Sequence, residues 1–418
     1  MTGVVVTGAG VLCATAPDVP GFARALREGV SGIGARPVDA SHPELRPGLA
    51  ADLPGFDLPA LLAGRSEELR RAAIRSTARS PMPVRASVAV ALEGWESAGL
   101  HRTPVAGERT GLVVAGHNLG GRFADTVRQR YATSPVHLPA RYPLQFMDTD
   151  HVGTVSQVLG VTGEGYTVGG ASASGNVAVI NAARLVAAGD VDVCLVLGAL
   201  TDLSDMERQA FYNLGAMAGR RRDAPERSSR PFDADHEGFV PGQGAACLVL
   251  ESAASATRRG VTPWARLAGY AMRLSGNGLA DPHLADEVDV MRRALRHAGL
   301  TARRIDYVNT HGTGSPLGDD VELTALRTVF GADADGPWIN STKGLIGHCL
   351  CAAGVVEAVA TLVQLRDGFV HGNANLHRPI GAAGRLVGTE PVTARIDHAL
   401  SNGFGFGGFN TSLVFGRA

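Results

Sequence analysis

Residues 166–176 read YTVGGASASGN, and this stretch decides the fold that the sequence predicts. The β-branched and aromatic residues at its start favour a strand end, and the two glycines after them allow a tight turn. Residues 176–188, which follow, are apolar almost all round, as in a buried helix, and Gly189 is a typical C-terminal cap. The sequence therefore predicts a strand that turns sharply into a buried helix, with Ser172 at the turn.

Segments of strand character recur on both sides of this turn. They lie at residues 4–7, 191–197, 245–250, 305–309 and 411–415, and a second buried helix is predicted at 349–365. Strands that alternate with buried helices predict an α/β protein whose sheets are covered by helices. The alternation runs through residues 1–251 and again through 252–418, which predicts duplicated halves within one compact unit.

The composition is that of an ordinary globular protein. The 418 residues are 45% hydrophobic and 19% charged, and 39 Lys and Arg against 40 Asp and Glu give a formal net charge of -1. This near-neutral balance gives no support for nucleic-acid binding. No apolar run reaches the length of a membrane span, and the N-terminus lacks the pattern of a secretion signal, so we expect no membrane association.

The five cysteines, at positions 13, 194, 247, 349 and 351, show no paired CxxC spacing. We interpret them as buried thiols in a reducing cytoplasm. The sequence contains neither HExxH nor a Cys/His group at ligand spacing, so no metal site is predicted. Gly8 and Gly10 match the start of a dinucleotide-binding GxGxxG turn, but Cys13 occupies the third glycine position, which argues against a dinucleotide cofactor.

Four segments place polar or aromatic residues beside glycines at the tips of predicted elements. They are the turn with Ser172, HGTGSP (311–316) with His311, NSTKGLIGH (340–348) with Lys343 and His348, and the loop GFGFGGFN (403–410). Taken alone, each has a structural explanation, since a lone histidine is more often structural than catalytic and a glycine cluster is more often a turn than an anion cradle. The order of all four along one chain is a far more specific signal.

These segments, together with PFDADHEGF (231–239) and SNGFGFGG (401–408), resemble the β-ketoacyl synthase family over essentially the whole chain. The resemblance implies a thiolase-like fold of layered α-β-α-β-α architecture. It implies that residues 1–251 form a half with the nucleophile position, and that residues 252–418 form a half with the histidines, the lysine and a glycine-rich gate loop.

The resemblance also implies the roles of individual residues. The nucleophile position falls on Ser172, and the two histidines that bind a thioester carbonyl fall on His311 and His348. The structural lysine falls on Lys343, and Glu322 is an implied structural carboxylate and a candidate partner of that lysine.

The implied gate of the site is Phe406, which lies between Gly405 and Gly407. The backbone N–H groups of Ser172 and Phe406 form the implied oxyanion hole of the acyl site. The implied substrate contacts are Thr313, Ser315 and Phe404.

The serine at position 172 departs from the family, whose nucleophile is a cysteine at the N-terminus of a buried helix. A serine hydroxyl is far less acidic than a thiol and needs an adjacent general base, whereas the family's histidines are placed to bind a carbonyl. We therefore expect Ser172 to accept acyl groups poorly and condensation to fail. Decarboxylation of a malonyl thioester needs only donors that stabilise charge on the thioester oxygen, and His311 and His348 supply them.

The sequence thus predicts an enzyme that converts malonyl-ACP to acetyl-ACP, where ACP is an acyl carrier protein. The amino-acid sequences of segments 169–176 and 309–319 resemble those of the serine-bearing malonyl-ACP decarboxylases of polyketide β-branching cassettes. Two alternatives stay open: a non-catalytic partner subunit similar to a chain-length factor, and a serine acyltransferase on carrier-protein thioesters. The presence of both histidines and the lysine favours catalysis over the partner subunit.

The resemblance implies no bound organic cofactor, because the phosphopantetheine arm arrives on the carrier protein. Carrier proteins are acidic, so we expect docking at the arginine-rich residues 65–85 or at residues 220–222. The resemblance also implies a homodimer.

Gln243 stands where synthases usually carry glutamate, and the sequence assigns no consequence to that loss of charge. It also leaves open the pathway, the final metabolite and the choice between malonyl and methylmalonyl.

Overall fold

The structure is a computed structural model that describes residues 3–36, 48–219, 223–278, 280–332 and 335–418. Its main sheet contains eleven strands in the order β12-β10-β9-β14-β15-β8-β1-β7-β6-β4-β5. The strands of the first half are β1 (Val4–Cys13), β4 (Thr110–Ala115), β5 (Gly165–Val168), β6 (Val193–Gly198) and β7 (Gly244–Ser252). Those of the second half are β8 (Ala265–Leu274), β9 (Tyr307–Asn309), β10 (Trp338–Asn340), β12 (Arg385–Leu386), β14 (His398–Gly405) and β15 (Phe409–Arg417).

The two halves of the sheet repeat one topology. The series β5-β4-β6-β7-β1 is mirrored by the series β10-β9-β14-β15-β8, so that each half has the strand order 3-2-4-5-1. In both halves strand 2 is parallel to strands 3 and 4, and strand 5 is antiparallel to strands 4 and 1. The duplicated architecture is therefore confirmed, while the boundary at residue 251 stays a prediction. The halves join where β1 pairs with β8.

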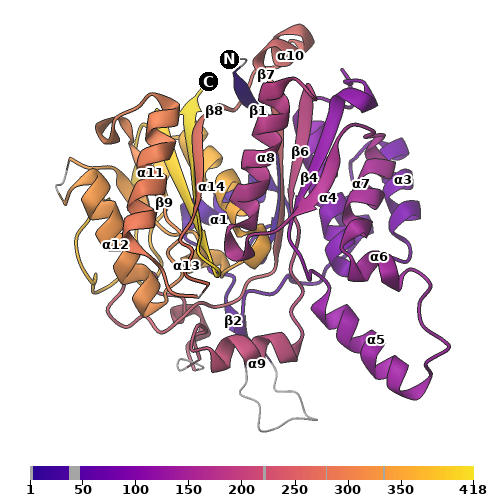
Figure 1. The fold of residues 1–418 in the computed structure, drawn as a ribbon, viewed down its shortest axis with the longest axis horizontal. Helices are drawn as coiled ribbons and strands as arrows, with labels where there is room; N and C mark the ends of the chain where they lie inside the picture. Colours follow the sequence, from indigo (N-terminus) through magenta and orange to yellow (C-terminus); the bar gives the residue numbers. More distant parts are fainter. Residues whose placement is uncertain (1–2, 37–47, 220–222, 279, 333–334) are drawn as a thin grey trace.

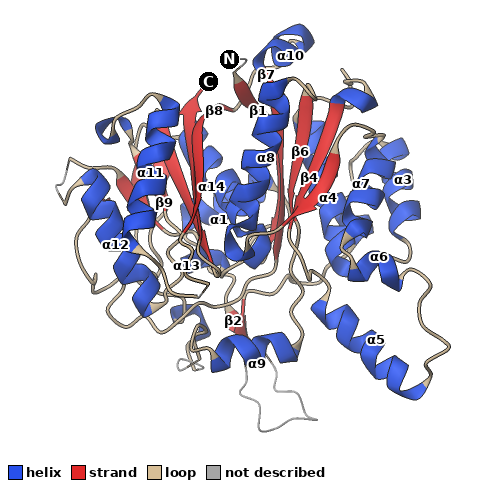
Figure 2. Ribbon diagram, in the orientation of Figure 1, coloured by secondary structure: helices blue, strands red, loops and turns tan. Residues whose placement is uncertain are grey.

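The helices form three layers around the two halves of the sheet (Figures 1 and 2). In Figure 1 the helix α8 (Ser174–Ala188) lies in the middle, with β8 on its left and β6 on its right. It packs with α14 (Ala353–Asp367) to form the central layer. The outer layers are α4 (Met82–Ser97) against β1 and β7 and α11 (Leu284–Ala298) against β8 and β15. Figure 2 shows these two helices on opposite sides of the molecule. This arrangement confirms the α-β-α-β-α layering.

The two helices predicted to be buried do form the core. α8 ends at Gly189, whose φ of 83° is the left-handed cap that its sequence indicates. α14 is buried from Ala353 to Leu365, and a short 3-10 turn at Leu350–Ala352 precedes it. Because both helices are apolar all round, they fit only between two sheets.

The first strand is longer than predicted and contains no dinucleotide-binding turn. β1 continues through Gly8 and Gly10 to Cys13. A Cβ atom on Gly8 would lie 2.5 Å from the carbonyl oxygen of Gly94 in α4, and one on Gly10 would overlap that of Val90. These glycines therefore serve the close approach of a helix to the sheet.

The remaining elements are short or peripheral. The helices are α1 (Val19–Glu28), α2 (Leu58–Leu61), α3 (Glu67–Thr77), α5 (Gly121–Thr133), α6 (Tyr142–Phe146), α7 (Thr149–Leu159), α9 (Asp205–Asn213), α10 (Ala253–Arg259), α12 (Pro316–Phe330) and α13 (Lys343–Ile346). The 3-10 turns are η1 (Gly107–Arg109), η2 (Ala171–Ala173), η3 (Pro225–Arg227), η4 (Ala302–Arg304) and η5 (Leu350–Ala352). The minor strands are β2 (Gly34–Ala35), β3 (Leu49–Ala50), β11 (Phe369–Val370) and β13 (Val392–Thr393).

The five cysteines are free thiols and all are buried. Within the ranges that the structure describes, no helix is long and apolar enough to cross a membrane. The same ranges contain no group of three or more His, Cys, Asp or Glu side chains that would hold a metal ion.

Candidate active site

Ser172 lies in the 3-10 turn η2, which leads directly into α8. The turn is tight enough that Ala171 adopts a positive φ of 49°. The Ser174 hydroxyl donates a hydrogen bond of 2.7 Å to the carbonyl oxygen of Ala171 and so fixes the turn. Ser172 therefore stands at the N-terminus of a buried helix, as the sequence predicts.

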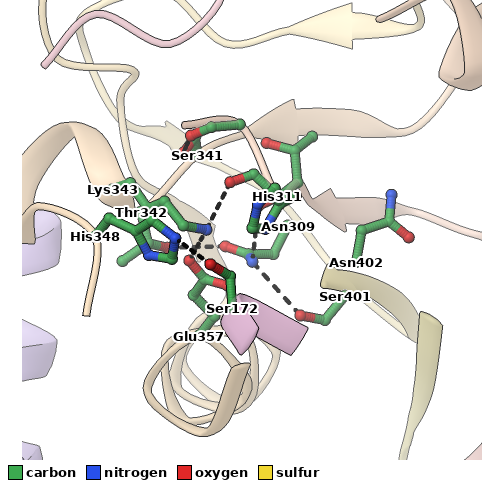
Figure 3. Close-up of polar contacts among 12 residues, drawn as sticks. Ser172, Asn309, His311, Ser341, Thr342, Lys343, His348, Glu357, Ser401 and Asn402 are labelled. Atoms are coloured by element: carbon green, nitrogen blue, oxygen red, sulfur yellow. Dashed lines mark hydrogen bonds and ion pairs between the residues drawn. The ribbon is translucent and has the colours of Figure 1, made fainter. Parts of the chain in front are cut away.

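The imidazole of His348 contacts this serine. Its Nε2 atom lies 2.8 Å from the Ser172 hydroxyl oxygen, which Figure 3 shows as a dashed line. The backbone N–H of Leu350 donates to Nδ1 at 3.2 Å. Burial lowers the pKa of His348 well below its usual value, so the ring is neutral and carries one proton. Because Nδ1 accepts a hydrogen bond, that proton is on Nε2, which donates to Ser172.

His311 lies beside His348 in the loop after β9. The two ring centroids are 5.6 Å apart and the ring planes are nearly perpendicular, at 85°. Burial lowers the pKa of His311 well below its usual value, and the charge of Lys343 adds to this effect. The Nδ1 atom of His311 is buried without a hydrogen-bond partner among the described residues. Both rings are therefore neutral imidazoles at one site.

Lys343 supports the loop that carries His311. Its Nζ atom donates a hydrogen bond of 2.5 Å to the carbonyl oxygen of His311 and forms an ion pair with Glu357. Both side chains of the pair are only 1% exposed, and burial raises the pKa of Glu357 to about 7. The suggested pairing of Lys343 with Glu322 is therefore wrong. The one signal for Glu357 in the sequence is that it is the only charged residue in the apolar segment 349–365.

Glu322 holds the same loop from the other side. Its carboxylate accepts the backbone N–H groups of His311 at 2.8 Å and Gly312 at 2.7 Å, and the side-chain amide of Asn402 at 3.1 Å. Burial raises its pKa to about 7, opposed by these hydrogen bonds. Asn402, which the sequence reasoning missed as a site residue, lies on β14 and links this carboxylate to the central sheet.

The glycine-rich loop lies against the serine turn. A Cβ atom on Gly405 would be 2.5 Å from the carbonyl oxygen of Gly170 and 3.3 Å from the backbone nitrogen of Ser172, so only glycine fits there. Gly407 has a φ of 85°, which also favours glycine. Phe406 between them is 38% exposed. The loop thus brings Phe406 to the cavity, while the oxyanion hole stays a prediction.

One cavity of about 240 Å³ joins these groups. Ser172, His311 and His348 line it, and Phe404 closes one side with its ring 5.7 Å from that of His311. The other predicted residues that line it are Thr313, Ser315, Gly405 and Phe406. The hydroxyl oxygens of Thr313 and Ser315 are 3.2 Å apart. Lys343, Glu322 and Glu357 act on this cavity through backbone and ion-pair contacts, although Glu322 also forms part of its wall.

The side-chain amide of Gln243 makes two hydrogen bonds, which explain why an amide suits this position better than a carboxylate. The amide nitrogen donates to Asp202 at 3.2 Å, and the amide oxygen accepts the backbone N–H of Leu53 at 2.9 Å. A glutamate here would face the carboxylate of Asp202, whereas the amide donates to it.

Three of the arginines predicted to dock a carrier protein form ion pairs within this chain. In residues 65–85, Arg65 pairs with Glu96, while Arg70 and Arg71 pair with Glu67. Residues 220–222 lie outside the described residues. Docking at either segment stays a prediction.

The duplicated sheet, the two central helices and the cavity at the tip of α8 define a thiolase-like protein. The models of the beta-ketoacyl synthase N-terminal and C-terminal domains match residues 1–256 and 264–377. The chain belongs to the β-ketoacyl synthase family.

Similar proteins include a decarboxylase and a synthase. The chain is 39% identical, over 98% of its length and 95% of the relative's, to the polyketide biosynthesis malonyl-ACP decarboxylase PksF of Bacillus subtilis (strain 168). It is 31% identical to 3-oxoacyl-(acyl-carrier-protein) synthase 2 of Coxiella burnetii, over 99% and 98% of the two chains. The ishigamide ketosynthase/chain length factor superposes with a TM-score of 0.86 at 25% identity, over 100% and 99% of the two chains.

Proposed function

We propose that the protein is a decarboxylase that converts a malonyl thioester on an acyl carrier protein to the acetyl thioester and CO₂. The proposal is supported by the similarity to PksF, whose name states this activity, and by the geometry around Ser172. It assigns the binding of the thioester oxygen to His311 and His348. Ser172 occupies the position that synthases use for a cysteine nucleophile.

The observation that carries the proposal is the hydrogen bond from the Leu350 N–H to Nδ1 of His348, which implies the tautomer of that ring. Its Nε2–H points at the Ser172 side of the cavity because the Leu350 N–H occupies Nδ1. When the carboxylate leaves as CO₂, the electron pair moves onto the thioester and negative charge develops on its oxygen. A positioned hydrogen-bond donor in a buried site stabilises such charge by about 3 kcal/mol. Two neutral imidazoles 5.6 Å apart supply a pair of these donors.

The 2.8 Å contact between Ser172 and His348 also favours a second candidate, a serine acyltransferase. In that reaction the ring would have to accept the serine proton at Nε2. The hydrogen bond from Leu350 to Nδ1 implies that the ring proton is on Nε2. The opposite tautomer would put two N–H donors, of Leu350 and of Nδ1, against each other. The decarboxylase therefore fits the hydrogen bonds better than the acyltransferase.

The proposal includes the partner and setting. The substrate is a malonyl group on the phosphopantetheine arm of an acidic carrier protein, and the enzyme needs no cofactor of its own. We place it in polyketide biosynthesis, at the β-branching step, as a cytoplasmic homodimer.

Incubation of the pure protein with malonyl-ACP and with acetyl-ACP tests the function, with the mass of the carrier arm as the readout. We expect acetyl-ACP from malonyl-ACP. Ser172→Ala retains most of this turnover, while His311→Ala and His348→Ala each lower it about 100-fold or more. Ser172→Cys gains acyl loading. His101→Ala, at an exposed position, is the matched control.

Three outcomes would contradict the proposal. Loss of all turnover in Ser172→Ala, with an acyl-serine trapped in the wild type, would establish the acyltransferase. Turnover that appears only beside a second synthase subunit would establish the partner-subunit alternative. Full activity in either histidine variant would remove the proposed donors.

A further inference from the structure

Among the acidic residues that line the cavity, Glu287 takes no part in the contacts described above. Glu287 lies in the first turn of α11 and lines the cavity with Ser172, His311 and His348. Its side chain is 1% exposed, and its Oε2 atom is buried without a hydrogen-bond partner among the described residues. A carboxyl group with a purely structural role is normally satisfied by donors when it is this deeply buried. Glu287 instead forms part of the wall of the cavity that Ser172 and both histidines line.

The packing of α11 places Glu287 on the His311 side of the cavity. Met291, one helical turn further on, contacts the amide nitrogen of Asn402 at 3.5 Å. That amide also donates to Glu322, whose carboxylate holds the backbone N–H of His311. The inner face of α11 is therefore one contact away from the residues that support His311.

Glu287 holds its proton more strongly than an exposed glutamate. Burial raises its pKa well above the usual value for glutamate, and the nearby carboxylate of Glu322 raises it further. Glu322 itself accepts three hydrogen bonds, which favour its ionised form, so of the two acids Glu287 holds its proton more strongly. A buried carboxyl group whose Oε2 atom has no partner among the described residues is available to give a proton to a bound ligand.

We propose that Glu287 donates the proton that replaces the departing carboxyl group on the acetyl carbon. This role rests on the proposed decarboxylation and completes it. The C–C bond breaks and its electron pair forms the enolate, and CO₂ leaves. The enolate carbon then takes the proton of Glu287, so that a C–H bond forms, an O–H bond breaks and Glu287 becomes a carboxylate. Water entering through the cavity returns a proton to Glu287.

A strongly held proton suits this step. The enolate carbon of a thioester is far more basic than any carboxylate, so the transfer runs downhill although Glu287 is a weak acid. Until a proton arrives, the enolate and CO₂ can recombine to malonyl thioester. An acid within the cavity therefore commits the reaction to acetyl thioester.

The test compares the wild type, Glu287→Gln and Glu287→Asp with malonyl-ACP in an equal mixture of H₂O and D₂O. The mass of the acetyl arm gives the rate and the ratio of deuterium to hydrogen in the methyl group. We expect Glu287→Gln to form acetyl-ACP about 100-fold more slowly, as for loss of a general acid. Its deuterium ratio differs from that of the wild type, because water replaces the carboxyl group as donor. Glu287→Asp keeps the wild-type ratio.

Asp289→Asn is the matched control, since it makes the same chemical change on the same helix outside the cavity lining, at a residue that pairs with Arg273. The proposal would be overturned if Glu287→Gln formed acetyl-ACP at the wild-type rate and with the wild-type ratio of deuterium to hydrogen. A slower variant with the wild-type ratio would also overturn it, because that pattern is structural. A wild type that makes no acetyl-ACP would overturn the decarboxylase proposal with it, whereas the preceding results leave the decarboxylase standing.

Discussion

The backbone N–H of Leu350 decides what the neighbouring imidazole of His348 can do. By donating to Nδ1 it leaves the ring proton on Nε2, which faces Ser172. A serine that is to act as a nucleophile needs the opposite tautomer from its base. A single backbone hydrogen bond thus suits the ring to binding an oxyanion and makes it a poor proton acceptor.

The ion pair of Lys343 and Glu357 is expected to couple strongly, because both side chains are buried. Glu357→Gln leaves an unpaired ammonium in the core and lowers the free energy of unfolding by about 3–5 kcal/mol. Lys343→Met in the same chain removes that charge, so the double variant loses less than the sum of the two single losses. Urea unfolding followed by circular dichroism measures all four free energies. Glu67→Gln, at an exposed pair, is the control and leaves stability unchanged. Strict additivity would contradict the coupling.

His151 makes the stability depend on pH. The ring is 2% exposed, its Nδ1 lies 3.0 Å from the Ser87 hydroxyl, and burial lowers its pKa to about 4. Below the unfolded pKa of about 6.5 the unfolded chain binds a proton that the folded chain excludes. The stability from this group is complete above pH 6.5 and is lost as the pH falls towards 4, at about 1.4 kcal/mol per pH unit.

The variant His151→Gln keeps a polar contact for Ser87 and cannot be protonated. We expect its free energy of unfolding to fall about 2 kcal/mol less than that of the wild type between pH 6.5 and 5. Urea titrations at the two pH values measure the difference, and the exposed His101→Gln is the control. Parallel pH curves for His151→Gln and the wild type would refute the assignment.

At the scale of elements, the glycines of β1 are matched to the surface of α4. A Cβ atom on Gly10 would overlap the carbonyl oxygen of Val90, and neither backbone is free to move. We expect Gly10→Ala to destabilise the fold by about 3 kcal/mol, at the upper end for an overpacked core. Gly153→Ala in α7 is the control, because no atom lies within 4 Å of its added Cβ, and there alanine stabilises the helix. Thermal unfolding of both variants decides the matter, and a Gly10→Ala melting curve equal to that of the wild type would contradict the packing argument.

Local patterns predict some elements well and others poorly. α8 and α14 follow from their own sequences, since a helix that is apolar on every side has to be buried. The extension of β1 through Gly8 and Gly10 does not, because it depends on a helix more than 70 residues away. The sequence alone favours a turn at such glycines, and tertiary packing makes them part of a strand.

The residues of the candidate site also fall into those that local sequence motifs predict and those that only the structure reveals. Ser172, His311, Lys343 and His348 are found from the sequence because each belongs to a local motif. Their partners are not, because the contacts run between elements. Lys343 in α13 reaches Glu357 in α14, and the Leu350 contact uses only a backbone N–H, which every residue except proline supplies. Glu287 has no motif at all, and only its place in the cavity reveals it.

The whole molecule explains why the site has this composition. The first half supplies Ser172 at the start of α8, and the second half supplies both histidines, the lysine and the glycine-rich loop. The central helices α8 and α14 hold equivalent places in the two halves, so their N-terminal ends meet near the cavity. Neither half contains the complete set of groups, which means that the two halves have to dock before any chemistry is possible.

The same topology leaves β5 at the end of the sheet, and we expect β5 of a second copy of the chain to pair with it. In the described ranges β5 has a single neighbouring strand, β4. On that side the carbonyl oxygens of Glu164 and Val168 accept backbone hydrogen bonds. Thr167 lies between these inward-facing residues, so its backbone N–H faces away from β4, where another strand can pair with it. Sedimentation should give twice the chain mass for the wild type and the chain mass for Thr167→Pro, which removes that donor while β5 keeps its bonds to β4. Leu386→Pro makes the equivalent change in β12, at the other end of the sheet, and this variant should stay dimeric. β12 keeps its bonds to its neighbour there, because the backbone N–H groups of Arg385 and Val387 donate to Pro337 and Ile339. A monomeric wild type would exclude the dimer, and a dimeric Thr167→Pro would place its interface elsewhere.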